Sequence, residues 1–255
     1  MITNNRYILK LFALVVFGVS FTDCKSPAEH MQPPPKLFVN GRKFTYKIVN
    51  TAQDQDHLTN KSNVVLTCYN KYKPGEYGIF KAGQVGDTTQ INIGWSYDAT
   101  SEPYWHTGLI ENDSILWSHP PREEEFAILE LSPFPFIKFP LKLGRHWNDQ
   151  LEVGPGYGDP KWGVKSIIQQ VSSSYQVVGK RTIDTHLGQI ECWVIQATAL
   201  CQQGNSTLEL LYSPYHGFVK MSFKTVNNKY LVMELIGTST INKQPFPFLK
   251  SPLDK

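Results

Sequence analysis

The stretch FVKMSFK at residues 218–224 decides the fold class, because its side chains alternate. Every second residue from Val219 to Phe223 is apolar, and successive side chains of an extended strand point to opposite faces. The same alternation occurs in TLELLY at residues 207–212 and in YLVMEL at residues 230–235. One face of each stretch is therefore expected to be buried and the other wet, as in an antiparallel sheet.

Turn residues separate these stretches and continue the pattern toward the N-terminus. Gln202–Asn205 and Ser213–Gly217 predict hairpin turns, and a turn at His186–Gly188 follows a strand-like run from Ser174 through Gly179 and Lys180 to Thr185. Further alternating runs lie at residues 44–49, 63–69, 90–97, 114–117, 126–131 and 189–197. The sequence predicts a mostly β fold: an antiparallel meander forming a curved sheet, open barrel or sandwich, with little helix.

Composition agrees with a β-rich domain and excludes one class of partner. The chain has 255 residues, of which 13% are aromatic and 18% charged, and its formal net charge is +3. An all-β domain can hold about 250 residues, so one domain is expected. Aromatic residues favour strands. The basic residues form no block of the kind that binds nucleic acid, so we expect no nucleic-acid partner.

The first 23 residues predict an export signal. Arg6 and Lys10 precede an apolar run from Leu11 to Phe21. Eleven helical residues rise only about 16 Å, whereas a bilayer core is about 30 Å thick. A charged start followed by a short apolar run is typical of a secretory signal.

A single cysteine, Cys24, follows this run directly. The arrangement resembles a bacterial lipoprotein signal, in which that cysteine is lipidated and becomes the new N-terminus. The resemblance implies an envelope protein held to the membrane by a lipid on Cys24, on the periplasmic or surface face of the outer membrane. The alternative is ordinary signal cleavage with Cys24 as a bystander, which would give a secreted protein.

The remaining chain divides into a tether, a domain and a tail. Residues 24–36 predict a flexible spacer, in which Pro33, Pro34 and Pro35 favour an extended conformation. Residues 37–240 are expected to form the β-rich domain, and residues 241–255 a tail that contains Pro and Phe.

Three further cysteines give no metal site. Cys192 and Cys201 would lie about 30 Å apart on one strand, on opposite faces, too far for a disulfide. Cys68 and Cys192 are expected to be small buried residues, with a bridge between them as the lesser alternative. No spacing of Cys and His suits zinc, and the sequence indicates no cofactor.

The C-terminal third carries a second resemblance. Residues 174–238 are similar to uncharacterised envelope lipoproteins of Bacteroidetes-like bacteria, whose curved sheet is similar to that of the lipoprotein carriers LolA and LolB. The matching residues are Thr185, Gly188, Ile190, Cys192, Trp193, Ile195, Leu211, Tyr212, Ser213, Pro214, Gly217, Phe218, Val219 and Lys220. These positions are mainly turn glycines and alternating apolar residues, so the resemblance implies architecture rather than activity.

A repeated Pro-Phe segment offers a candidate surface. PFPFIKFPL at residues 133–141 recurs as PFPFLKSPL at residues 245–253, and prolines at this density exclude a central strand. Both copies are expected to be extended edge segments, which either cover the core or form an aromatic surface for a ligand or partner. The candidate residues for that surface are Phe134, Phe136, Phe246, Phe248, Trp95 and Trp117.

No catalytic motif points to an enzyme. His106, His119 and His146 lie beside Trp or Pro in expected turns, which favours surface or structural roles. The leading hypothesis is a non-enzymatic envelope protein that binds an apolar ligand or lipid in its curved sheet. The alternatives are an assembly factor that docks on an outer-membrane or secretion partner, and a hydrolase with an unrecognised site.

Overall fold

The computed structural model describes residues 35–49, 56–71, 90–97, 106–154 and 168–241. They lie within one compact unit, Pro34–Lys255. No helix in this part of the chain is long and apolar enough to cross a membrane. Cys24, Phe246 and Phe248, which the sequence analysis selected, fall outside the described residues.

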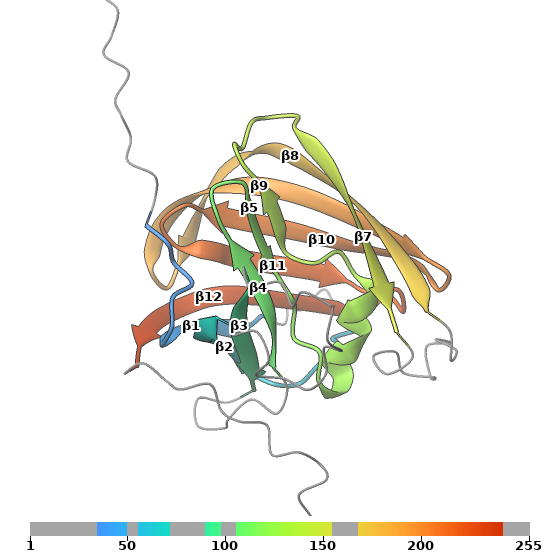
Figure 1. Cartoon of the computed structure of the whole chain (residues 1–255), viewed down its shortest axis with the longest axis horizontal. Helices are drawn as coiled ribbons and strands as arrows, with labels where there is room; N and C mark the ends of the chain where they lie inside the picture. The colour runs from blue at the N-terminus through green and yellow to red at the C-terminus, as the bar shows by residue number, and fades with distance from the viewer. Residues whose placement is uncertain (1–34, 50–55, 72–89, 98–105, 155–167, 242–255) are drawn as a thin grey trace, which may run out of the picture. The chain divides into compact units, whose positions relative to one another are not determined.

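The described residues form one sheet and one short helix (Figure 1). The helix, η1, is a 3-10 helix at Glu124–Leu131. The strands are β1 (Arg42–Ile48), β2 (Asn63–Lys71), β3 (Ile91–Ser96), β4 (His106–Glu111), β5 (Ile115–Ser118), β6 (Phe136–Lys138), β7 (His146–Val153), β8 (Gln169–Thr185), β9 (Gly188–Cys201), β10 (Gly204–Ser213), β11 (Gly217–Lys224) and β12 (Tyr230–Thr240).

The topology forces the sheet to curl. All twelve strands are antiparallel in the order β6-β5-β4-β3-β2-β1-β12-β11-β10-β9-β8-β7, so β6 and β7 are its two edges. At about 4.8 Å per strand, a flat sheet would separate these edges by about 53 Å. The chain from Lys138 to His146 spans at most about 29 Å. The sheet is therefore rolled into a nearly closed, barrel-like form (Figure 1).

Aromatic side chains join the two edges. Phe136 of β6 lies 6.2 Å from the ring of Trp147 on β7 and 5.6 Å from the ring of Tyr175 on β8. Trp147 and Tyr175 stack at 5.5 Å with an interplanar angle of 3°. The Tyr175 hydroxyl also donates a hydrogen bond of 3.0 Å to the Phe134 carbonyl oxygen. Ring contacts of this kind stabilise beyond their buried area, and here they connect the first strands of the sheet to the last.

The fold class and most of the expected strands are confirmed. The runs at residues 44–49, 63–69, 90–97 and 114–117 correspond to β1, β2, β3 and β5, and the C-terminal meander is present as β8 to β12. Gly179 and Lys180 do not divide β8, because a register shift between Val177 and Gly179 lets one strand of 17 residues continue past them.

The expected strand at residues 126–131 is wrong. These residues lie in η1, where Phe126 and Leu129 join the main core and Leu131 joins a second cluster with Val153, Val171 and Ala199. The run has apolar residues three apart as well as two apart, and three is the repeat of a 3-10 helix. Burial on several sides of the segment favours that helix over a strand with one wet face.

The expected turns at His106 and His146 are also wrong, since these residues begin β4 and β7. The cysteine interpretation is confirmed. Cys68 and Cys192 are buried, and the three described cysteines are free thiols. Cys192 and Cys201 both lie on β9.

Candidate functional site

Four of the residues that the sequence analysis selected lie close together. Trp117 of β5 pairs with Phe136 of β6, and its ring lies 5.7 Å from that of Phe134. The indole Nε1 of Trp95 donates a hydrogen bond of 3.0 Å to the carbonyl oxygen of His119, whose ring lies 4.6 Å from Phe134. Trp95, Phe134 and Phe136 are each no more than 6% exposed. At the first Pro-Phe copy these rings therefore contribute to the core of an edge segment.

His119 sits at the centre of a buried charged cluster. Its Nε2 lies 3.2 Å from Oε1 of Glu130 on η1, and Nε of Arg122 lies 3.3 Å from the same oxygen. Both the histidine and glutamate side chains are about nine-tenths buried. Neither contact meets the geometry of a hydrogen bond to Glu130 Oε1. The cluster is therefore stabilised by electrostatic attraction rather than by directed hydrogen bonds.

The tautomer of His119 follows from its other neighbour. Nδ1 lies 2.8 Å from the carbonyl oxygen of Pro120, which only accepts hydrogen bonds, so Nδ1 carries a proton. Nε2 therefore faces the Glu130 carboxylate, and His119, Glu130 and Arg122 are best described as a structural cluster that fixes η1 to the end of β5.

A second histidine contact lies elsewhere in the sheet. The Ser213 hydroxyl is 3.3 Å from Nδ1 of His216 in the β10–β11 turn. Ser206, which lies seven residues before Ser213 on β10, donates a hydrogen bond of 2.8 Å to the carbonyl oxygen of Leu131, the neighbour of Glu130. Glu130 therefore lies near the Ser206 end of β10. Seven strand residues span about 23 Å, which separates this end from Ser213. The Ser213–His216 pair and the His119–Glu130 pair are thus too far apart to act on one substrate as a nucleophile, base and acid.

The chain enters the sheet at a site organised by Glu111 on β4. Its carboxylate accepts hydrogen bonds from the backbone amides of Leu37 at 2.9 Å and Phe38 at 3.0 Å. The Phe38 ring is buried and stacks on Phe44 at 4.6 Å. Burial, followed by the nearby negative charge of Glu111, raises the pKa of Tyr212 well above its usual range. These contacts fix the entry of the N-terminal segment.

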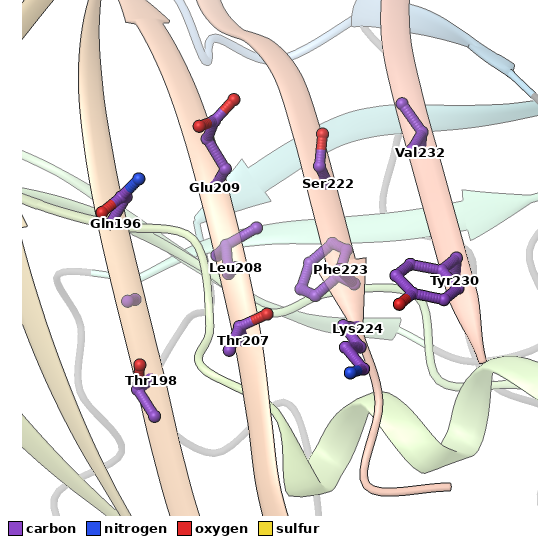
Figure 2. A pocket seen from close by; sticks show the side chains of 11 residues that line it. Gln196, Thr198, Thr207, Leu208, Glu209, Ser222, Phe223, Lys224, Tyr230 and Val232 are labelled. Atoms are coloured by element: carbon purple, nitrogen blue, oxygen red, sulfur yellow. The ribbon is translucent and has the colours of Figure 1, made fainter. Parts of the chain in front are cut away.

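Two hollows lie on the outer side of the sheet. One, of about 460 Å³, is lined by residues of β9 to β12 (Figure 2). The other, of about 610 Å³, is lined by residues of β7 to β9. Thr198 lines both. Hydroxyl, amide and charged side chains stand around the first hollow, with Tyr230 at one side (Figure 2).

The described residues offer no site for a metal ion, since no group of three or more His, Cys, Asp or Glu among them converges. The chemistry available on the outer face is mainly hydrogen bonding by neutral groups, beside the charged side chains of Asp149, Glu209 and Lys224. Serine and threonine hydroxyls both donate and accept, as do the side-chain amides of glutamine and asparagine. Such an arrangement suits recognition of a polar, uncharged ligand better than bond cleavage.

Comparison with solved structures finds proteins described as exported or as lipoproteins. A protein described as exported, with a YmcC-like fold, from Bacteroides fragilis NCTC 9343 is 11% identical, with a TM-score of 0.40; 79% of this chain and 97% of that chain are covered. A lipoprotein from Parabacteroides distasonis ATCC 8503 is 11% identical, with a TM-score of 0.44 and coverage of 79% and 96%. The hypothetical lipoprotein YmcC of Escherichia coli (K12) is 7% identical, with a TM-score of 0.31 and coverage of 82% and 92%.

These identities and TM-scores carry no argument about activity or ligand. No protein-family model matches the chain, and no curated protein matches it.

Sequence reasoning missed two features of this site. Glu130 looked like one residue of an alternating strand, and only its i, i+3 apolar neighbours could have indicated a 3-10 helix. The outer face was missed because its serine, threonine and glutamine residues occupy the solvent-exposed positions that any alternating strand pattern contains. Their continuity across six strands depends on register, which depends in turn on turn lengths and on the shift at Val177.

Proposed function

We propose that this chain is an exported, lipid-anchored protein of the bacterial cell envelope that acts by binding rather than by catalysis. The observation that carries the proposal is Cys24, which follows a charged start and a short apolar run and precedes a proline-rich spacer. A lipid on Cys24 would hold the protein at a membrane surface. Such a protein would stay with the membranes when soluble material is removed.

The geometry of the domain entry supports a tethered arrangement. Residues 25–36 would span about 37 Å if fully extended in a polyproline conformation. The segment ends at Leu37 and Phe38, whose amides are held by Glu111. A lipid anchor would thus connect through the spacer to one fixed point of the sheet and keep the domain near the membrane.

Two observations favour binding over catalysis. The buried His119–Glu130 pair is compensated by Arg122 and lies among aromatic rings, as expected of a structural cluster. The Ser213–His216 contact lies at the other end of β10, without an acidic partner among its recorded hydrogen bonds and ion pairs. A hydrolase with an unrecognised site is accordingly the least supported of the three hypotheses.

The position of the hollows favours an outer binding surface. A ligand within the curved sheet would need a continuous apolar cavity, whereas buried side chains from β1 to β12 and η1 form one continuous cluster there. Both hollows described above lie on the outer face instead. Docking of an envelope component on that face is the mode of action that we favour over an apolar ligand inside.

Fractionation of the full-length protein expressed in a bacterial host tests the proposal. We expect the wild-type protein in the membrane pellet after a high-salt wash, and the Cys24→Ser protein in the soluble periplasmic or secreted fraction. Globomycin, which blocks lipoprotein signal peptidase, should cause an unprocessed wild-type precursor to accumulate. Equal distribution of the two proteins, together with processing that is insensitive to globomycin, would overturn the anchor.

A further inference from the structure

We infer that the outer face of β7 to β12 is a binding trough for a neutral oligosaccharide or polysaccharide. The inference rests on the proposed binding function and names its ligand class. We call this surface the outer polar face and define it by Asn148, Gln150, Ser172, Ser174, Gln176, Gln196, Thr198, Thr207, Ser222, Lys224 and Tyr230.

Strand register aligns these side chains in rows that cross the sheet. One row runs through directly paired residues of six strands: Asn148, Ser174, Thr198, Thr207, Lys224 and Tyr230. A second row runs beside it through Gln176, Gln196, Glu209 and Ser222. With strands about 4.8 Å apart, the first row is about 24 Å long. A ligand laid across the strands would thus meet a new polar side chain at intervals comparable to the length of one sugar unit.

The two hollows turn these rows into one trough. Thr198 lies in the first row and lines both hollows, so the hollows adjoin at β9. On the β7 side the lining includes Asn148 and Ser174, and on the β11 side it includes Thr207 and Lys224. Figure 2 shows the β9 to β12 side, with Tyr230 beside Lys224 at its far end. An extended ligand could therefore occupy both hollows at once.

The chemistry of the trough selects the ligand class. Its hydroxyl and amide groups both donate and accept hydrogen bonds, which complements the hydroxyl groups of a sugar. Charge is small, because Glu209 is paired with Arg181 at 3.1 Å and the carboxylate that lines the second hollow, Asp149, is half-buried. The Lys224 ammonium lies 5.8 Å from the centre of the Tyr230 ring, leaving one cation at the end of the row. A neutral polyhydroxylated chain matches this balance.

Other classes of partner fit less well. Nucleic acids and acidic polymers need clustered Lys and Arg side chains to neutralise them. An apolar ligand needs a mainly hydrophobic lining. Binding hot spots between proteins are enriched in Trp, Tyr and Arg, and Ser and Thr are under-represented there. In the lining of the two hollows, Ser, Thr, Asn and Gln outnumber the outward-facing apolar residues, which are Leu200 and Val232.

Part of the trough is fixed before a ligand arrives. Nε2 of Gln150 donates a hydrogen bond of 3.0 Å to Oε1 of Gln170, across β7 and β8. These strands pair without a register shift from His146 to Val153. Side chains on a regular ladder lose less conformational entropy on binding than side chains on a mobile loop, which favours binding of an extended polymer.

Calorimetry with the full-length protein, purified in a detergent that contains no sugar, tests the inference. The probes are neutral hexaoses of glucose in different linkages and a protease-digested envelope polysaccharide from the cells that make this protein. We expect at least one of these probes to bind, with little dependence on salt. The Cys24→Ser protein should bind equally well, so failure of the lipid anchor and failure of the trough are distinguishable.

A matched pair of variants locates the site. Ser174→Ala combined with Thr198→Val removes two hydroxyls from the centre of the first row, and we expect about tenfold weaker binding, which corresponds to about 1.4 kcal/mol. Thr182→Val makes the same kind of change on an exposed residue of β8 outside both hollows, and binding should not change. Circular dichroism and thermal unfolding confirm that each variant is folded.

Several results would overturn the inference. Failure of every probe, including the envelope polysaccharide, excludes a glycan ligand on this face. Equal binding by the double variant and Thr182→Val places the ligand elsewhere. Binding only to an acidic polysaccharide, abolished by salt, indicates an electrostatic site. An envelope extract can also be tested as a competitor of the probe. If its competition persists after periodate oxidation of the extract but is lost after protease digestion, the face binds a protein partner.

Discussion

The ring of Phe136 on β6 meets the ring of Tyr175 on β8 at 5.6 Å and an interplanar angle of 79°. β6 is one end of the strand order and β8 is the neighbour of the other end, β7, so this contact bridges the two edges of the rolled sheet. Trp147, stacked on Tyr175, extends the contact to β7. The barrel-like form thus depends on side chains at its seam as well as on hydrogen bonds within its ladders.

Removing the Phe136 ring should destabilise the fold more than its position on an edge strand suggests. Phe136 is 6% exposed, and truncation of a buried phenylalanine costs about 3–5 kcal/mol. We expect Phe136→Ala to lower the free energy of unfolding by about 3 kcal/mol, measured by urea denaturation. Leu143→Ala, on a side chain that is 73% exposed, is the control and should change it by about 0.5 kcal/mol or less. Equal effects of the two substitutions would show that the seam does not hold the sheet together.

The Glu130 carboxylate should contribute far more to stability than an exposed glutamate. Glu130→Ala leaves His119 and Arg122 buried without their shared anion, and loss of one partner of a buried pair costs about 3–5 kcal/mol. Glu130→Gln should cost less, because its amide can donate to Nε2 of a neutral His119. Glu124→Ala, which breaks an exposed pair with Lys61, should cost less than about 1 kcal/mol. A Glu130→Ala protein as stable as Glu124→Ala would contradict the structural role of the cluster.

Stability should fall below neutral pH because of His106. Burial lowers the pKa of His106 from 6.5 to about 4 in the folded protein, so between these values the unfolded chain binds more protons. The contribution is complete above about pH 6.5 and is lost as the pH falls toward 4. For a fully shielded ring this shift is worth about 3 kcal/mol, and partial exposure of His106 reduces the expected loss to roughly 1–2 kcal/mol.

Urea denaturation of the wild-type and His106→Gln proteins at pH 7.5 and at pH 4.5 measures this contribution. The wild-type protein should lose more stability than His106→Gln over that interval, because glutamine does not titrate. The opposite order, or identical losses, would mean that His106 is not kept neutral by burial.

The described cysteines should differ in their reactivity. Burial raises the pKa of Cys192 to about 11 and that of Cys68 further, whereas the thiolate is the reactive form. Cys201, half-buried at the end of β9 with Sγ 3.5 Å from the Gly204 carbonyl oxygen, should react first. Mass spectrometry of the Cys24→Ser protein after a short maleimide pulse should find the label on Cys201, and on the other two only after unfolding. Early labelling of Cys68 or Cys192, or a disulfide between them, would disprove this order.

The strands of the C-terminal third could be predicted because each has one buried and one wet face. From Val219 to Lys224 buried and less buried residues alternate, as the apolar and polar residues of the sequence do. The turn at Ser213–Gly217 contains Gly217, whose positive φ the reversal of the chain needs. β4 and β7 were not predicted. β3 was expected from its alternation, yet all six of its residues are buried, so alternation did not indicate which face would be wet.

The site was harder to predict than the fold, because it depends on distant segments meeting. The tryptophans and phenylalanines were identified as candidates, but their convergence around His119 depends on how β3, β5 and the segment before β6 lie in the sheet. Glu130 was assigned to a strand because apolar spacings of two and three coincide in its segment. The aromatic surface formed by Phe246 and Phe248, and the lipid on Cys24, remain predictions from the sequence.

The intact mass of the mature protein, purified from bacterial membranes, tests the central claim most directly. We expect an N-terminus at Cys24 that carries diacylglyceryl and acyl groups, and a Cys24→Ser protein that lacks this added mass. An unmodified protein, cleaved at another position and released as soluble material, would contradict the anchored envelope role and leave a free secreted binding protein as the alternative.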